Sequence, residues 1–386
     1  MERALRRLRL TEPALLPVAE KAARGARLDR ADALRLFQAR DLVGLGRLAD
    51  AAARRRTGDD VYYVFNRQVN PTNLCVLSCA FCDFAAKPGD AHAYEMSMDA
   101  VLARVDDDVR EVHIVGGLWP AWGYQRHVDI VAAIRRAHPA VTIKAWTAVE
   151  IDFLARLGKR PVAQVLQELR GAGLDALPGG GAEVFSERVK AALFPQKIGA
   201  DRWLEIHRAA HRLGIPSNAT LLYGHVETIE ERVDHMLRLR ALQDETGGFL
   251  AFIPLAYQLG ETKLVARAAP APDDLRTVAT ARLLLDNFTY VKAYWVMLGL
   301  ETAALALRFG ANDVDGTIGG EKIAHLAGAA SPVELTRQSV VRLIRDAGKV
   351  PVERDALYRP VRPAAAVAPA AGAAPGAASN AGPATP

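Results

Sequence analysis

Strand-like and helix-like segments alternate along most of this chain, and this alternation restricts its fold more than any other feature. The segment 61–65 is β-branched and aromatic, and similar segments follow at 112–115, 141–146, 174–177, 219–223, 250–253, 290–297 and 313–318. Helical patterns separate most of these segments, which is typical of a parallel sheet. We therefore expect an α/β fold, most simply a TIM-type (β/α)8 barrel. A (β/α)6 partial barrel with a C-terminal extension is the alternative.

The two ends of the chain differ from this alternating region. Leucines recur at helical spacing between residues 12 and 57, and an aspartate within residues 28–34 could cap a helix. We expect an N-terminal helical extension over residues 1–60 and the barrel with its C-terminal extension over residues 61–358. Residues 359–386 consist mostly of Ala, Pro and Gly, which cannot bury a core, so this tail is expected to be disordered.

All three cysteines of the chain, Cys75, Cys79 and Cys82, lie within eight residues. An odd number of cysteines so close together does not indicate a disulfide framework, and clustered thiolates suit a soft metal centre. A [4Fe-4S] cluster usually takes four cysteine ligands, so three would leave one iron open to a non-protein ligand. A structural zinc site usually needs four protein ligands, and the chain has no second C-x2-C motif. Three unreactive buried cysteines are the remaining alternative.

In a barrel of this kind the active site forms at the C-terminal ends of the strands. The cysteine stretch follows the first predicted strand, and Gly116-Gly117 follows the second, where glycines let a ligand approach the backbone. Glu183 comes after three glycines at the end of the fourth strand, where its carboxylate could accept hydrogen bonds from a ribose diol. Thr147 and Glu150 end the third strand and His225 ends the fifth. For each of these a structural turn is the alternative.

The spacing C-x3-C-x2-C, with Phe81 before the last cysteine, resembles the signature of the radical S-adenosylmethionine (SAM) enzymes. Other motifs are similar to the aminodeoxyfutalosine synthase family, and this resemblance covers roughly residues 12 to 358. Two positions depart from the expected pattern, since Leu118 stands where radical SAM enzymes have an acid and Asp83 where the family has alanine. The matching motifs are Asn70-Pro71-Thr72-Asn73-Leu74-Cys75, Ile114-Val115-Gly116-Gly117-Leu118, residues 144–151, residues 178–183, residues 222–225, residues 243–249 and residues 352–355.

The resemblance implies a [4Fe-4S] cluster held by the three cysteines, with SAM bound to the fourth iron as a co-substrate. It implies a transferase that adds the 5'-deoxyadenosyl radical of SAM to 3-[(1-carboxyvinyl)oxy]benzoate. The product is 6-amino-6-deoxyfutalosine, formed with decarboxylation in menaquinone biosynthesis. The residues expected to contact SAM are Phe81, Gly116, Gly117 and Glu183. No catalytic residue beyond the cluster ligands is identified.

The implied substrate carries two carboxylates, so cations or hydrogen-bond donors should line the barrel mouth. The candidates on or just after predicted strands are Arg67, Lys144, Glu150, His225 and Lys292. Two other functions remain open. The dehypoxanthine futalosine cyclase of the same pathway shares the cluster and much of the glycine pattern, and a non-catalytic iron–sulfur protein is a distant alternative.

Charge and hydropathy indicate which partners to expect. The net charge of +5 is modest, and no basic stripe with interleaved aromatic residues indicates nucleic-acid binding. No apolar run approaches the ~20 residues of a membrane span, and the N-terminus lacks the apolar core of a signal peptide. We expect a cytoplasmic enzyme with a small-molecule substrate and an electron donor such as flavodoxin or ferredoxin, without nucleic-acid or membrane partners.

Overall fold

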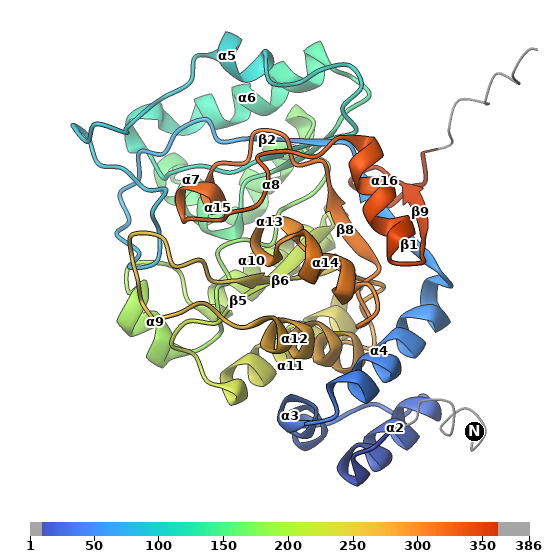
Figure 1. Cartoon of the computed structure of the whole chain (residues 1–386). Helices are drawn as coiled ribbons and strands as arrows, with labels where there is room; N and C mark the ends of the chain where they lie inside the picture. Colours follow the sequence, from blue (N-terminus) through green and yellow to red (C-terminus); the bar gives the residue numbers. More distant parts are fainter. Residues whose placement is uncertain (1–9, 362–386) are drawn as a thin grey trace, which may run out of the picture.

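The computed structural model describes residues 10–361 (Figure 1). A 3-10 turn at η1 (Pro13–Leu15) and three helices, α2 (Leu16–Ala23), α3 (Arg30–Gln38) and α4 (Leu42–Thr57), precede the first strand. The carboxylate of Asp29 accepts a hydrogen bond from the Asp32 N–H and caps α3, within the segment where the sequence predicts an aspartate cap. The expected domain boundaries stay predictions, and the expected tail lies outside the described residues from residue 362 onward.

The described strands run parallel to one another wherever they pair. Strands β1 to β8 belong to the barrel, and the ninth strand, β9, pairs with β1. Their bounds are β1 (Asp60–Val64), β2 (Asn66–Val69), β3 (Glu111–Ile114), β4 (Thr142–Ala145), β5 (Ser217–Tyr223), β6 (Phe249–Ala256), β7 (Tyr290–Val291), β8 (Asp313–Gly316) and β9 (Val350–Glu353).

The pairings run around a closed ring. β2 pairs with β3 and β3 with β4, and single bridges at Ala176 and Leu177 connect β4 to β5. β5 pairs with β6 and β6 with β7, a bridge between Lys292 and Asp313 connects β7 to β8, and β8 pairs with β1. β1 and β2 are two parts of one stretch broken at Phe65, so together they form one member of the ring and close it. The segment of Ala176 and Leu177 between β4 and β5 is the eighth member. This confirms the α/β barrel and favours its eight-membered form.

Two predicted strands differ from the structure. The strand expected over residues 290–297 ends at Val291, and the short helix α13 (Trp295–Leu298) follows it. Trp295 is buried there, and its indole N–H donates to the Gly316 carbonyl oxygen at 2.8 Å, which holds the chain in the turn. The strand expected over residues 174–177 is reduced to two bridges, because Asp175 and Ala176 both donate their N–H to Ile143 O in an irregular ladder.

Helices surround the barrel and fill the connections between its strands. α4 packs on α12 and α3 packs on α11, so the N-terminal helices rest on the outer layer of the barrel (Figure 1). No helix within residues 10–361 combines the length and apolar character needed to cross a bilayer. The remaining helices are α5 (Met98–Leu102), η2 (Pro120–Trp122), α6 (Gly123–Ala137), α7 (Ala148–Gly158), α8 (Val162–Ala172), α9 (Glu187–Leu193), α10 (Ala200–Arg212), α11 (Ile229–Thr246), α12 (Ala271–Leu284), α14 (Leu300–Ala306), α15 (Ile323–Leu326) and α16 (Arg337–Asp346).

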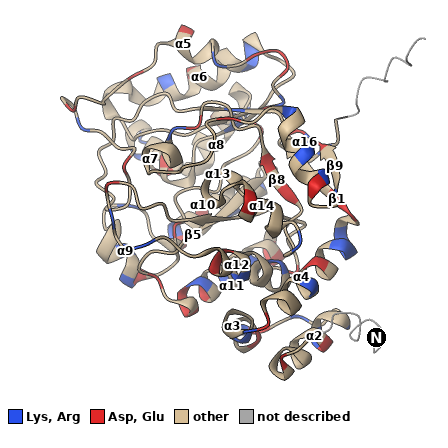
Figure 2. Ribbon diagram, in the orientation of Figure 1, with Lys and Arg blue, Asp and Glu red and all other residues tan. Residues whose placement is uncertain are grey.

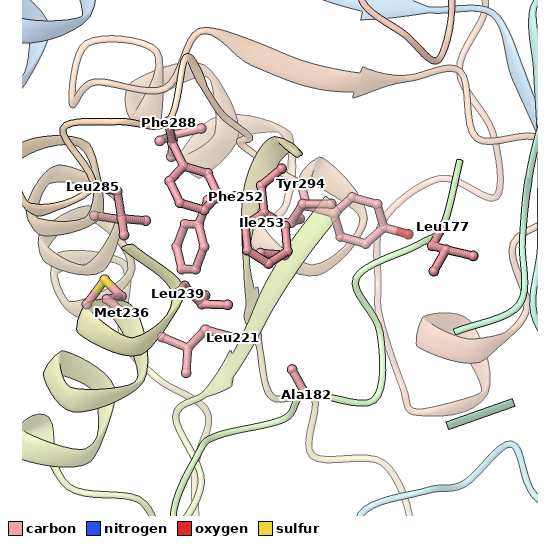
Figure 3. Packing of buried hydrophobic residues seen from close by; sticks show 14 of the residues in the cluster. Leu177, Ala182, Leu221, Met236, Leu239, Phe252, Ile253, Leu285, Phe288 and Tyr294 are labelled. Carbon is pink, nitrogen blue, oxygen red and sulfur yellow. The ribbon is translucent and has the colours of Figure 1, made fainter. Parts of the chain in front are cut away.

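Side chains alternate along the strands between the helical layer and the barrel interior, as a period of two requires. On β6, Phe252 is directed toward Phe288, which lies in the turn between α12 and β7, and their ring centroids lie 6.4 Å apart in an edge-to-face arrangement (Figure 3). Leu221 of β5 lies on the same side, whereas the neighbouring Ile253 of β6 points away from Phe288 (Figure 3). The apolar core therefore lies mainly between strands and helices.

Part of the barrel interior is filled by charged side chains instead of apolar ones. Lys144 Nζ lies 2.6 Å from Glu111 Oε1, and Lys292 Nζ lies 2.5 Å from Asp315 Oδ1. From β9, Arg354 reaches inward to Asp313 at 2.7 Å, and β8, which carries both aspartates, is coloured for its acidic residues in Figure 2. All six side chains are buried, and their charges balance. We call them the buried charge network; its members are Glu111, Lys144, Lys292, Asp313, Asp315 and Arg354.

Candidate active site

The cysteine stretch forms a loop directly after β2, at the C-terminal end of the barrel strands. Main-chain bonds hold this loop from outside: the Cys75 N–H donates to Ala86 O at 3.0 Å, and the Ala80 N–H donates to Leu193 O at 2.7 Å. The Lys87 ammonium donates to the Cys75 and Leu77 carbonyl oxygens at 2.8 and 2.7 Å. The loop is thus fixed by its backbone, which leaves the thiols available for another role.

All three thiols are free and partly exposed. Burial raises the pKa of the Cys79 thiol to about 11, so a bound metal is needed to stabilise its thiolate. Among residues 10–361, no three His, Cys, Asp or Glu side chains converge on one point as the ligands of a single ion would. Three cysteine thiols on one loop suit an iron–sulfur cluster that a non-protein ligand completes.

A cation that sequence reasoning missed lies beside this loop. Lys197 forms a close ion pair with Glu183, and its Nζ lies 5.2 Å from the centroid of the Phe81 ring. The Phe81 ring in turn packs edge-to-face on Phe194, with 5.9 Å between centroids. Although burial opposes its charge, Glu183 and the nearby Cys79 thiol raise the pKa of Lys197 above its usual value. No local motif marks Lys197, which reaches the loop only through the segment after α9.

The structure brings Glu183 close to the cysteine loop, as the sequence predicts, but with its charge already paired. Glu183 is 9% exposed and sits in the left-handed region, with φ of 47°. Its carbonyl oxygen accepts a hydrogen bond from the Leu222 N–H at 2.9 Å, which ties the glycine-rich turn to the end of β5. A contact between Glu183 and a ribose diol stays a prediction.

Gly116 and Gly117 contact the cysteine loop itself. The Gly117 N–H donates to Thr72 O at 2.8 Å, and a Cβ built on Gly117 would lie 2.1 Å from Leu74 O. The Gly116 N–H donates to Glu150 Oε1 at 2.9 Å. Glycine at position 117 is therefore needed for close packing against the residue before Cys75, and its expected contact with SAM stays a prediction.

The Gly117→Ala variant tests this packing. The added methyl group would overlap the Leu74 carbonyl, so we expect the loop backbone to shift, at a cost of about 1–3 kcal/mol in the free energy of unfolding. Iron content after reconstitution should fall as well. Urea denaturation and iron analysis measure the two effects. The matched control is Gly171→Ala on α8, where a Cβ meets no atom within 4 Å. That change should be neutral or stabilise the helix by about 0.5–1 kcal/mol; equal behaviour of the two variants would contradict the packing argument.

Glu150 has a capping role at the N-terminus of α7. Its Oε2 accepts hydrogen bonds from the Thr147 N–H at 2.7 Å and the Thr147 hydroxyl at 2.8 Å, while the Thr147 side chain caps the helix. Burial raises the pKa of Glu150 to about 7. Its carboxylate thus links α7 to the Gly116 loop beside the mouth, and a substrate contact stays a prediction.

The basic candidates lie in different surroundings. Arg67 points to the outside of the barrel, where its guanidinium lies 3.5 Å from both Asp106 and Glu334. Lys144 and Lys292 point inward but are paired within the buried charge network. Substrate binding by these three residues stays a prediction, and none of them reaches the mouth as a free cation.

The side chains of His225 and Asp83 each contact a neighbouring loop. His225 places Nε2 3.1 Å from Leu222 O and Nδ1 3.1 Å from a Glu227 carboxylate oxygen. Burial lowers the pKa of His225. Asp83 turns its carboxylate toward the β6–α12 connection, where a Cβ on Gly260 would lie 2.0 Å from Asp83 Oδ2. The residue that departs from the family pattern therefore packs against this connection.

Comparisons with known proteins agree with this geometry. Two family models match the chain: the radical SAM superfamily over residues 69–239 and the CofH/MqnC C-terminal region over residues 246–366. The chain is 46% identical to an aminodeoxyfutalosine synthase of Thermus thermophilus, over 92% of this chain and 97% of that protein. It is 37% identical to a cyclic dehypoxanthine futalosine synthase of Streptomyces coelicolor, over 90% of each chain.

Among solved structures, methylornithine synthase (PylB) has a similar fold. It superposes with a TM-score of 0.70 over 86% of this chain and 97% of that chain, at 17% sequence identity. At this identity the likeness concerns the fold alone. It agrees with the barrel fold described above.

Proposed function

Because the chain belongs to the radical SAM superfamily and, within it, to the aminodeoxyfutalosine synthase family, we propose that it transfers the adenosyl group of SAM to 3-[(1-carboxyvinyl)oxy]benzoate. The product is 6-amino-6-deoxyfutalosine, and one carboxylate is lost. The observation that carries this proposal is the 46% identity to the synthase over nearly the whole chain, against 37% to the cyclase. The enzyme is a transferase of menaquinone biosynthesis that uses a [4Fe-4S] cluster and SAM.

Cys75, Cys79 and Cys82 are the proposed cluster ligands. Their support is the free, partly exposed state of all three thiols on a loop fixed by its backbone. When bound, such a cluster supplies one electron for the reductive cleavage of SAM. The chain itself contributes position: the main-chain bonds of the loop hold the thiols at the barrel mouth without using them.

The proposed SAM contacts lie around this loop. Phe81 offers a ring face at the mouth, and the turn that carries Glu183 approaches the loop from the fourth strand position. Lys197 joins them as a further proposed contact, since a paired cation and anion can bind the opposite charges of an amino-acid group. Gly116 and Gly117 complete the set through their backbone.

We also propose a substrate class, an electron donor and a cellular location for the enzyme. The substrate is a small molecule, and the electron comes from a small redox protein such as flavodoxin or ferredoxin. We place the enzyme in the cytoplasm, because free thiols and an oxygen-sensitive cluster suit a reducing compartment. The modest net charge of +5 supports neither a nucleic-acid nor a membrane partner.

Labelled SAM tests the reaction. With SAM labelled in its adenosyl part, the anaerobically reconstituted enzyme should place the label in an adenine-bearing adduct that has lost one carboxylate. One SAM should be consumed per product, because the adenosyl group becomes part of the product. Mass spectrometry of the products measures both outcomes.

The cyclase gives a different result in the same experiment. It builds no bond between the adenosyl group and the substrate, so the label would appear only in free 5'-deoxyadenosine. That result, with the enol ether untouched, would rule out the synthase assignment.

A further inference from the structure

One histidine inside the barrel has no role in the structure described so far. His113 of β3 is in register with Gln68 of β2 and Lys144 of β4, so these three side chains form one layer across neighbouring strands. The Gln68 amide donates to the Tyr294 hydroxyl at 3.3 Å, although Tyr294 follows β7, which β8 separates from the β1–β2 stretch. Paired residues of parallel strands point to the same face, so His113 also points into the barrel.

His113 keeps its hydrogen-bonding capacity free. No hydrogen bond, ion pair or ring contact reaches its side chain from any of the residues 10–361. His113 points into the barrel, yet part of the residue stays accessible to water. A side chain in this situation lines a space inside the barrel, and buried polar groups normally have a partner.

A second hydrogen-bond donor faces the same interior. The Tyr294 hydroxyl accepts the Gln68 amide hydrogen, which leaves its own hydrogen without a protein acceptor in the described part of the chain. Tyr294 is 8% exposed, and Ile253 of β6 points away from the outer core toward the same interior (Figure 3). The interior thus offers polar donors on one wall and apolar surface on another.

The charges around His113 explain which ligand suits this space. The groups that face it are Lys144, Glu111, Asp315 and Lys292, and each cation is paired with a carboxylate. Burial, with Lys144, lowers the pKa of His113 to about 3, so the imidazole is neutral at neutral pH and donates one N–H. An anion placed here needs hydrogen-bond donors, because water cannot solvate it.

We propose that His113 and Tyr294 bind the ring carboxylate of the aromatic substrate inside the barrel, below the cysteine loop. This inference rests on the proposed function. The enol-ether double bond must lie near the adenosyl group at the mouth, so the opposite end of the molecule, its ring carboxylate, extends deeper. The layer of Gln68, His113 and Lys144 occupies that deeper position, and Ile253 supplies apolar contact for the ring.

The test compares His113→Ala and Tyr294→Phe with wild type, using the enol ether and its analogue in which the ring carboxylate is an amide. A hydrogen bond to a charged group is worth a factor of roughly 10 to 100 in binding. We expect KM for the acid to rise roughly 10- to 100-fold in His113→Ala, with SAM affinity and iron content unchanged. Tyr294→Phe should show a smaller rise in the same direction.

Wild type should prefer the acid to the amide, and His113→Ala should lose most of this preference. A merely structural role for His113 would weaken both substrates equally, and that result would overturn the proposal, as would an unchanged KM. His138→Gln is the matched control, since His138 lies near the end of α6 beside the exposed Asp107. Its kinetics should equal those of wild type.

Benzoate binding, measured by calorimetry in the reconstituted enzyme with SAM present, separates this inference from the proposed function. If wild type forms no adenosyl adduct, the proposed function fails. Benzoate that binds wild type and not His113→Ala would still support the site. Equal benzoate binding by both proteins would overturn the site even where the adduct forms.

Discussion

Cys79→Ala is expected to abolish SAM cleavage. Cys79 is one of the three cysteines of the chain, so no other thiol can replace it in the loop. With two thiolates left, the cluster loses one of its three protein anchors, and activity should fall by roughly 10³-fold or more, as for other essential catalytic groups. Anaerobic reconstitution should give far less than the about four irons per chain of a complete cluster. Iron analysis, visible absorption and release of 5'-deoxyadenosine measure these outcomes, and Cys75→Ala and Cys82→Ala should behave alike.

Ser78→Ala is the matched control for the cysteine variants. Ser78 is exposed in the same loop, so its substitution should leave iron content and SAM cleavage at wild-type values. The thermal stability of the apoprotein should be unchanged in both variants, because the Cys79 thiol is free. A Cys79→Ala protein that retained a full cluster and cleaved SAM, or a wild-type protein that held stoichiometric zinc without iron–sulfur absorption, would contradict the assignment.

Arg354→Met is expected to give the largest loss of stability. Arg354 is fully buried and pairs with Asp313 at 2.7 Å, within the buried charge network. Methionine fills similar volume but leaves that carboxylate without its partner, and breaking a buried pair in this way costs about 3–5 kcal/mol. Urea denaturation of the apoprotein should therefore show a markedly lower midpoint.

Two further variants identify the cause of this loss. Arg359→Met removes an ion pair with Asp355 in which the arginine side chain is 69% exposed, and it should cost less than about 1 kcal/mol. Adding Asp313→Asn to Arg354→Met removes the unpaired charge and should restore part of the lost stability. Arg354→Met and Asp313→Asn are also measured separately. If the double variant lost as much free energy of unfolding as these two single variants together, the loss would come from packing and not from charge.

The regular parts of the fold could be predicted from the sequence because their signal is local. The apolar runs at 112–115 and 219–223 lie within or beside strands of the structure. Helix α7 was missed, although Thr147 and Glu150 have the spacing of a capping box. We interpreted these two residues as the end of a strand lining the mouth, whereas Glu150 uses its carboxylate to cap the helix and hold Gly116. The apolar strand pattern before Thr147 competes here with the capping-box pattern that begins at Thr147, and the structure follows the second pattern.

Some residues of the candidate site could be predicted from a local motif, and others could not. The three cysteines form a short motif, so their association could be predicted without a structure. Lys197 could not, because its place beside Phe81 depends on the path of the chain after α9. The inward direction of His113 depends on strand register, and a shift of one residue would turn it to the helices. Sequence alone does not fix that register.

The barrel closes where β1 pairs with β8, and β9 pairs with the other edge of β1. The order in which these strands are synthesised therefore matters for folding. Tyr62 pairs with Asp313, and Asp60 pairs with Val350, so the strand that leads into the cysteine loop receives these neighbours only after the rest of the barrel has been synthesised. Pairings between such distant segments form slowly, since a long loop must close first. Until β8 and β9 dock, that strand has an open edge on the ribosome-bound chain. Iron that arrives earlier meets three thiols on an unfinished scaffold, so we expect productive cluster loading only after β8 and β9 have docked.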